Sequence, residues 1–141
     1  KAPYLVQQKI NLMHHHGRPY DFRLMLQKVN EKWQWTGYGA RLAGKDSITT
    51  HVPKGGELLA PDQLQPAVDL EILEIISKRA AQKLEEHFAP LYELSLDIGC
   101  DQEGHYWLFE ANAKPMVFDE HDIEQKRMKR LVDIFYELSG F

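Results

Sequence analysis

Two acidic side chains and one amide stand in a pattern that can bind a hard divalent cation. Asp97 lies in the apolar run 94–98, and Glu110 and Asn112 lie at the end of the run 107–112. Carboxylate and amide oxygens suit Mg²⁺ or Mn²⁺ and are poor ligands for zinc or copper. So few protein ligands leave coordination positions for phosphate oxygens and water. These residues therefore predict a magnesium or manganese site.

The geometry of this site depends on the turn between the two runs. If the turn holds two or four residues, the runs form a hairpin in which Asp97 faces Leu108, with Glu110 as its diagonal neighbour. Diagonal neighbours lie roughly 7 to 8 Å apart at the backbone, so both carboxylates can reach one cation. Asn112 shares their face because side chains repeat every second residue. A turn with an odd number of residues would separate the two acids.

The simpler alternative is that both acids are solvated side chains on an exposed strand face. The apolar neighbours weigh against it, because they make this hairpin a core element; they are Leu94, Leu96, Ile98, Trp107 and Phe109. Acids paired on the other face of a core hairpin, beside an asparagine, then need a function.

The elements that position these residues predict an α+β fold, an antiparallel β-sheet packed against two helices. Residues 19–28 with 33–42, and 91–100 with 105–111, have the pattern of two hairpins, and residues 4–10 that of a short strand. Residues 67–88 and about 120–138 are predicted helices. Their apolar side chains at helical spacing are Ile72, Ile76, Ala80, Leu84 and Phe88, and Ile123, Leu131, Ile134, Phe135 and Leu138. The long connection 43–65 is of a kind that is usually functional or mobile.

The length and composition of the chain limit the number of domains, the classes of binding partner and the cellular compartment. The 141 residues have room for one domain, and we expect 1–141 to be a single domain. With 17 basic and 21 acidic side chains the net charge is −4, which offers no basic field for nucleic acid or an anionic membrane. A single cysteine excludes an internal disulfide and fits a cytoplasmic, reducing compartment. Because the chain begins with Lys1, we expect it to be a piece of a longer protein.

These motifs resemble those of the ATP-grasp superfamily. Asp97 followed by the segment 110–115 (EANAKP) is similar to its metal-binding signature, and the segment 20–23 (YDFR) is similar to its earlier Asp-x-Arg strand. More narrowly, the chain resembles the endospore coat-associated, YheC/YheD-type ATP-grasp proteins over nearly its whole length. The resemblance implies the C-terminal subdomain of an ATP-grasp domain whose N-terminal lobe is absent from this chain.

What the resemblance implies for function is an ATP-dependent carboxylate-amine or carboxylate-thiol ligase. ATP-grasp enzymes phosphorylate a carboxylate with ATP, and a nucleophile then attacks the acyl phosphate. By this resemblance Asp97, Glu110 and Asn112 hold one or two Mg²⁺ (or Mn²⁺) ions at the terminal phosphates of ATP. The implied partners are a small-molecule carboxylate, its nucleophile and the N-terminal lobe. The alternative is a structural or nucleotide-binding module of a spore-coat protein that does not catalyse a reaction.

Two arginines are the candidate catalytic residues. Arg23 matches the strand arginine of the family that meets phosphate or the acyl phosphate, an oxyanion that suits its planar fork. The alternative for Arg23 is a surface salt bridge with Asp21 or another acid. Arg41 is a similar candidate, but a four-residue turn between its strand and that of Arg23 puts it on the opposite face. A β-bulge at Gly37 or Gly39 would bring it back.

Two segments are candidates for nucleotide binding. Their residues are Gln7, Gln8 and Ile10 in the first and Lys54, Gly55 and Gly56 in the second. The first lies where the family's hinge passes adenine, and its alternative is an ordinary edge strand. The second resembles a family loop whose backbone amides approach an anion. This chain has His51 where that loop usually has asparagine, and a glycine pair in a long loop can also be a simple turn.

Overall fold

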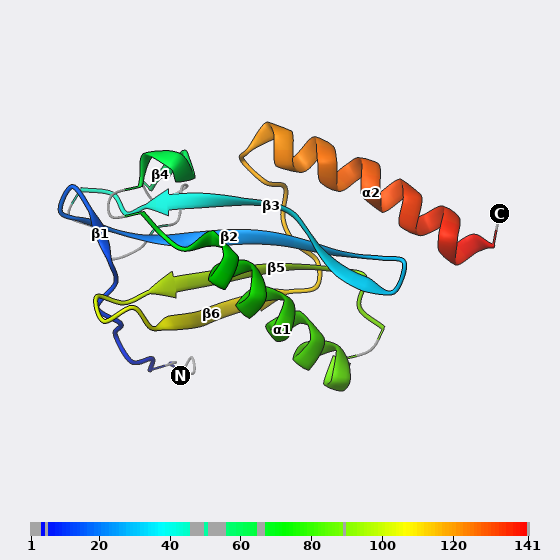
Figure 1. Cartoon of the computed structure of the whole chain (residues 1–141), viewed down its shortest axis with the longest axis horizontal. Coiled ribbons are helices and arrows are strands. Elements are labelled where there is room, and N and C mark those ends of the chain that lie inside the picture. The colour runs from blue at the N-terminus through cyan, green and yellow to red at the C-terminus, as the bar shows by residue number, and fades with distance from the viewer. Residues whose placement is uncertain are drawn as a thin grey trace.

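The computed structural model describes residues 4, 6–45, 50, 56–64, 67–88 and 90–140. In this part the strands form one six-stranded antiparallel sheet of order β4-β3-β2-β5-β6, with β1 paired to β2 (Figure 1). The strands are β1 (His14–His15), β2 (Arg18–Val29), β3 (Lys32–Leu42), β4 (Glu57–Leu59), β5 (Glu93–Cys100) and β6 (Tyr106–Asn112). The α-helices are α1 (Leu70–Phe88) and α2 (His121–Ser139), and a short 3-10 helix spans Pro61–Gln63. The predicted α+β fold is confirmed.

The central hairpin of β2 and β3 closes with a tighter turn than the sequence suggested. Val29 pairs with Lys32, so only Asn30 and Glu31 lie in the turn. Both have positive φ angles, 48° and 60°, as a two-residue turn of this hand requires.

A β-bulge in this hairpin sets the faces of β3. Met25 pairs with Gly37, whereas Leu26 pairs with Trp35, so Thr36 is an extra residue on β3. The bulge lies beside Gly37, one of the two glycines expected to hold it. Because one inserted residue reverses the alternation of side chains, every later residue of β3 changes face.

The face of the sheet toward α1 carries the main hydrophobic core. Its members from the central strands are fully or almost fully buried; they are Tyr20, Phe22, Leu24, Leu26, Leu94, Leu96 and Ile98. Helix α1 begins after Asp69, whose carboxylate accepts hydrogen bonds from the backbone N–H groups of residues 71 and 72. It buries Leu73, Ser77 and Ala81. Of the predicted apolar stripe, Ile76, Ala80 and Leu84 are partly buried and pack against this core. Ile72 and Phe88, at its two ends, are exposed.

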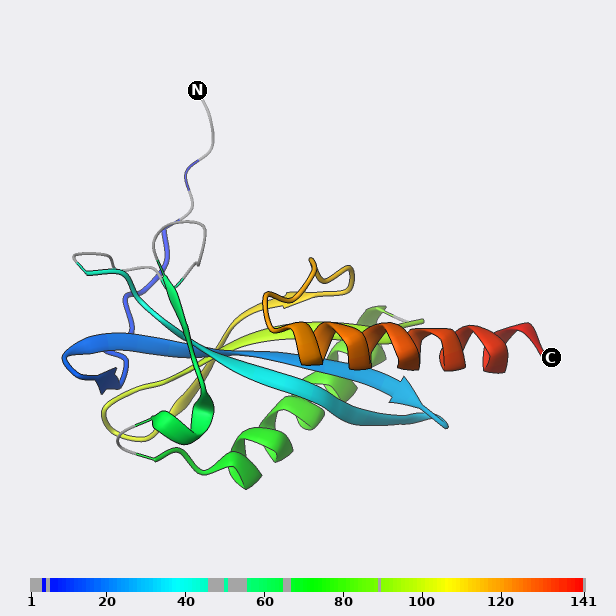
Figure 2. The same ribbon diagram turned by 90° about the horizontal axis from the view of Figure 1, so that it is seen from above.

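Helix α2 covers part of the other face (Figure 2). Ile123 packs with Met25 and Phe118 in a second, smaller core cluster. Arg127 is buried as well: its carbonyl accepts a hydrogen bond from the Gln27 amide, and its guanidinium pairs with Glu93. The C-terminal end of α2 extends past the tip of the β2–β3 hairpin in both views. Phe135 and Leu138, which were expected to pack inward, are exposed and line a hollow that Leu91 also lines.

The N-terminal stretch differs from the prediction. The described residues between 4 and 10 form no strand, so the predicted strand 4–10 is wrong for that part of the chain. The segment that follows lies along the β5–β6 turn, where Met13 N–H donates to Cys100 O at 2.8 Å and Leu12 pairs with Asp101. Neither of the two described α-helices is long and apolar enough to cross a membrane.

The contact between α2 and the sheet depends on the absence of a side chain at residue 37. A Cβ built on Gly37 would lie 2.7 Å from Ile123 Cγ1. We expect Gly37→Ala to lower the free energy of unfolding by about 1–3 kcal/mol, because it overpacks this contact. Urea denaturation measures the change. In an Ile123→Ala background the same substitution should cost much less, and equal costs in both backgrounds would show that this contact is not the cause.

Candidate functional site

The face of the sheet that α2 covers only in part carries a group of polar side chains from four strands. They are Asp21 and Arg23 on β2, Arg41 on β3, Asp97 on β5, and Glu110 and Asn112 on β6. Pairing places them on one face, because Arg23 is opposite both Gly39 and Asp97, and Asp21 is opposite Arg41. The bulge at Thr36 is what brings Arg41 to the same face as Arg23.

The β5–β6 hairpin brings the two acids together by a route that the sequence did not reveal. Cys100 pairs with Tyr106, so the turn holds residues 101–105, an odd number that by itself would put the acids on opposite faces. A second bulge restores the alternation, because Ile98 pairs with Leu108 whereas Asp97 pairs with Glu110. The expected pairing of Asp97 with Leu108 is therefore wrong: Asp97 lies directly opposite Glu110.

The third oxygen-bearing side chain lies next to this pair. Asn112 is opposite Ser95, one cross-strand pair away on the same face. The side chain of Asp97 is 13% exposed, and Glu110 is an exposed residue. No group of three His, Cys, Asp or Glu side chains among the described residues is arranged to hold a metal. The donor set here is two carboxylates and an amide, which fits a hard cation that shares its coordination with phosphate or water.

A buried ion-pair network adjoins these acids. Arg41 donates from Nε to Asp21 Oδ1 at 2.9 Å and from Nη2 to Asp21 Oδ2 at 2.7 Å. The same Nη2 lies 2.9 Å from Asp97 Oδ2. The hydroxyl of Thr50 donates to Asp21 Oδ2 at 2.8 Å. Burial raises the pKa of Asp21, and its bonds with Arg41 and Thr50 offset only part of that rise.

Arg23 does not form the salt bridge with Asp21 that was its alternative, because Asp21 is bound to Arg41. The guanidinium carbon of Arg23 lies 4.7 Å from the centre of the Phe118 ring, a cation–π contact. Its Nε atom is buried and has no hydrogen-bond partner in the described part of the chain. Arg23 therefore keeps donor capacity at a position directly opposite Asp97.

Glu120 is a residue of this site that the sequence analysis did not single out. It stands just before α2, and its Oε1 atom is buried without a hydrogen-bond partner among the described residues. A Cβ on Gly39 would overlap this carboxylate, so the glycine leaves the space that Glu120 fills. Burial is the main cause that raises the pKa of Glu120, Asp119 adds to the rise, and the charges of Arg23 and Arg41 oppose it.

Comparison with known proteins decides the family. The sequence pattern that defines the YheC/D like ATP-grasp family matches residues 1–137. The chain belongs to this family. It is 36% identical over 121 residues to the endospore coat-associated protein YheD of Bacillus subtilis strain 168, covering 81% of the chain and 27% of that relative. It is 30% identical over 121 residues to the endospore coat-associated protein YheC of the same strain, covering 79% of the chain and 33% of that relative.

The segments that the ATP-grasp resemblance assigns to nucleotide binding are only partly described. Lys54 and Gly55 lie outside the described residues, and Gly56 immediately precedes β4. Gln7 and Gln8 are exposed and belong to no strand. Ile10 is half-buried, and its carbonyl accepts a hydrogen bond from the N–H of the residue two positions later. The roles of these segments stay predictions.

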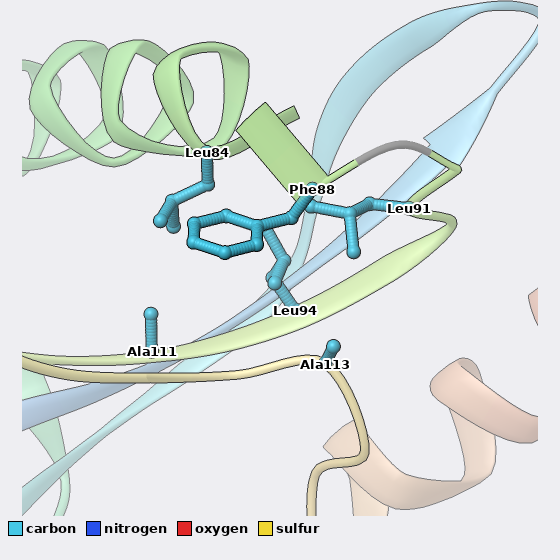
Figure 3. A pocket seen from close by; sticks show the side chains of 6 residues that line it. All are labelled: Leu84, Phe88, Leu91, Leu94, Ala111 and Ala113. Atoms are coloured by element: carbon cyan, nitrogen blue, oxygen red, sulfur yellow. The ribbon is translucent and has the colours of Figure 1, made fainter. Parts of the chain in front are cut away.

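One apolar hollow in the described part of this ATP-grasp chain is not part of the candidate site. It has a volume of about 250 Å³ and is lined by Leu84, Phe88, Leu91, Leu94, Ala111 and Ala113 (Figure 3). Figure 3 shows the side chains of Leu84 and Phe88 pointing from α1 toward the strands. Because Ala111 and Glu110 are consecutive residues of β6, their side chains lie on opposite faces. The hollow is therefore on the α1 face, away from the acids.

The raised pKa of Glu120 gives a prediction about stability and pH. An acid whose pKa is higher in the folded protein favours folding when protonated, and this contribution is lost as the pH rises from 4.5 through the raised value. We therefore expect Glu120→Gln to stabilise the protein at pH 7 by about 1 kcal/mol. The gain should shrink below pH 4.5, the ordinary pKa of the group.

Thermal unfolding of wild type and Glu120→Gln across pH 4–8 measures this difference. Glu137→Gln, at an exposed acid near the end of α2, is the control and should show no such pH-dependent gain. A loss of stability in Glu120→Gln at neutral pH would show that the carboxylate has a partner that the static structure does not reveal.

Proposed function

We propose that this chain is the Mg-ATP-binding C-terminal lobe of an ATP-grasp ligase that joins a carboxylate to an amine or thiol through an acyl phosphate. The observation that carries the proposal is the register of β2, β5 and β6, in which Arg23, Asp97 and Glu110 are consecutive partners across the sheet. Asn112 lies two residues further along β6, opposite Ser95. Membership of the YheC/D like ATP-grasp family supports the same chemistry.

Each side chain has a separate task in this proposal. Asp97, Glu110 and Asn112 would hold Mg²⁺ or Mn²⁺, which when bound neutralises charge on the terminal phosphates of ATP. Arg23 would bind the transferred phosphoryl group, because its planar, charged guanidinium suits that oxyanion and its Nε has no hydrogen-bond partner among the described residues. Positioning and charge neutralisation are the main contributions of a protein to phosphoryl transfer.

We propose a task for Arg41 that differs from the one that the resemblance implied. Two of its nitrogens are bound to Asp21 and one of these also contacts Asp97, and the residue is only 4% exposed. Its capacity to meet a phosphate directly is therefore small. Arg23 is the better candidate for the contact with phosphate. We assign to Arg41 the task of holding the carboxylates of Asp21 and Asp97 in place.

The remaining parts of the ligase would come from sequence outside this chain. The chain spans about a quarter of YheD and a third of YheC. We propose that an N-terminal lobe of the same protein supplies the other wall of the nucleotide site, and that substrate choice depends on this lobe and on the connection 43–65. The two relatives are named for association with the endospore coat, and we propose the same setting here.

The proposal is tested with Glu110→Ala in the full-length protein. We expect wild type to release ADP from ATP when it is given suitable carboxylates, and Glu110→Ala to lose at least about 100-fold of that rate because a metal ligand is gone. Coupled ADP detection over a carboxylate panel is the measurement.

Glu103→Ala is the matched control, because Glu103 is an exposed acid in the turn of the same hairpin. It should leave the rate unchanged. If wild type and Glu110→Ala are equally inactive over the whole panel, a module of the spore coat without catalysis becomes the better explanation, as the names of the two relatives also allow.

The isolated chain should bind ATP weakly and should not turn it over. In this proposal the lobe that closes over the nucleotide lies outside the 141-residue chain, so the affinity is expected to be in the range of about 0.1 mM or weaker. Calorimetric titration of the 141-residue chain with Mg-ATP measures it. Nanomolar affinity would contradict the division of the site between two lobes.

A further inference from the structure

We propose that Asp21 is a positioning residue for the metal ligand Asp97, acting through Arg41. By holding the guanidinium of Arg41, Asp21 limits Arg41 to one oxygen of Asp97 and leaves the other for a cation. The inference rests on the proposed function, since it assumes that Asp97 binds a metal. It assigns a task to Asp21 and Thr50, which the ligand set of Asp97, Glu110 and Asn112 does not include.

The first support is the geometry of the bonds. Asp21 and Arg41 are direct cross-strand partners, and their side chains form a two-pronged contact of 2.9 and 2.7 Å. Asp97 is the partner of Arg23, which lies two residues beyond Asp21 on β2, so Arg41 reaches Asp97 diagonally. That contact joins Nη2 to Oδ2 at 2.9 Å. Arg41 thus binds Asp21 through two nitrogens and contacts Asp97 through one.

The second support is burial. The side chains of Arg41 and Asp21 are 5% and 6% exposed, whereas that of Asp97 is 13% exposed. Thr50 adds a hydrogen bond of 2.8 Å to Asp21. A buried charge must keep a partner, and an arginine that loses one carboxylate turns to the nearest other. Here the nearest other carboxylate is Asp97.

The third support is the balance of charge. Asp21, Arg41 and Asp97 together carry one net negative charge, and Glu110 opposite Asp97 adds a second. Arg23 and Glu120, the other charged groups here, have opposite signs and leave this sum unchanged when Glu120 is ionised. Two negative charges suit a divalent cation. Without the charge of Asp21, Arg41 would neutralise Asp97, and its planar fork fits both oxygens of a carboxylate. The acid at residue 21 therefore keeps Asp97 available.

The test is the affinity of the full-length protein for Mn²⁺, measured by the loss of the free-ion signal in electron paramagnetic resonance. Glu110→Ala defines binding elsewhere in the protein and is subtracted. We expect Asp21→Asn to weaken the remaining Mn²⁺ binding by about 10-fold, the size seen when the partner of a metal ligand is removed. Adding Arg41→Met should restore the affinity to within about threefold of wild type, because the competing cation is gone while a long side chain still fills the space.

Glu93→Gln is the matched control, because Glu93 is also held by two nitrogens of a buried arginine, Arg127, on the same face of the sheet. It should lower stability without changing Mn²⁺ affinity. If Asp21→Asn does not fold, Thr50→Val removes only one hydrogen bond to Asp21 and should weaken Mn²⁺ binding in the same direction, by about threefold.

Three results would overturn the inference. Unchanged affinity in Asp21→Asn, or in Thr50→Val where that variant replaces it, would show that Asp21 does not position Asp97. A double variant as weak as Asp21→Asn would show that release of Arg41 is not the cause. Wild type that binds no more Mn²⁺ than Glu110→Ala would remove the metal site itself, and the proposed function would fall with it.

Discussion

The alternation of side chains along a strand is the constraint on which this structure depends. Six polar residues from four strands share one face only because each hairpin contains one extra residue. Without the bulge at Thr36, Arg41 would point into the α1 core, and without the bulge beside Asp97, Glu110 would point away from its partner. Both bulges lie next to the candidate site, where such irregularities commonly occur. The fold thus joins a regular hydrophobic face to an irregular polar one.

Burying charged side chains on the polar face of the sheet costs free energy, and ion pairs between these side chains offset part of that cost. Arg41 is shared between two carboxylates, and Arg127 is shared between Glu93 and Glu124. Two atoms remain without partners in the described part, Arg23 Nε and Glu120 Oε1. Native proteins rarely leave buried polar atoms unpaired except where function requires it. Their presence beside the predicted metal ligands fits a site that is completed by a ligand.

The sequence predicted the layers of this fold well and its register poorly. Alternation in 19–28 places the apolar side chains of β2 on the α1 face, where they form the main core. It does not reveal that Asp21, Met25 and Gln27 on the other face are buried too. The predicted partner of Asp97 was wrong, because the alternation of apolar residues does not show the extra residue, Phe109, that the bulge adds to β6. The sequence pattern does not single out Arg127, because its partner Glu93 is distant in sequence. The acids Asp97 and Glu110 were predicted because the family motif contains both, and the expected hairpin put both on one face.

The Asp21–Arg41 pair could not be predicted from the sequence. Asp21 lies opposite Arg41 only because Thr36 is an extra residue in β3, and the sequence does not show where that bulge lies.

The odd turn of the β5–β6 hairpin and the bulge beside it are linked. Loss of one residue from 101–105 would reverse β6 unless the extra residue at the bulge were lost as well. Relatives that keep the two acids should therefore gain or lose residues at this hairpin in matched pairs, one at the tip and one in the strand. A sequence alignment with a single, unmatched gap in this hairpin would pair residues from one face of β6 with residues from the other face. It would do so even if the aligned residue types were identical.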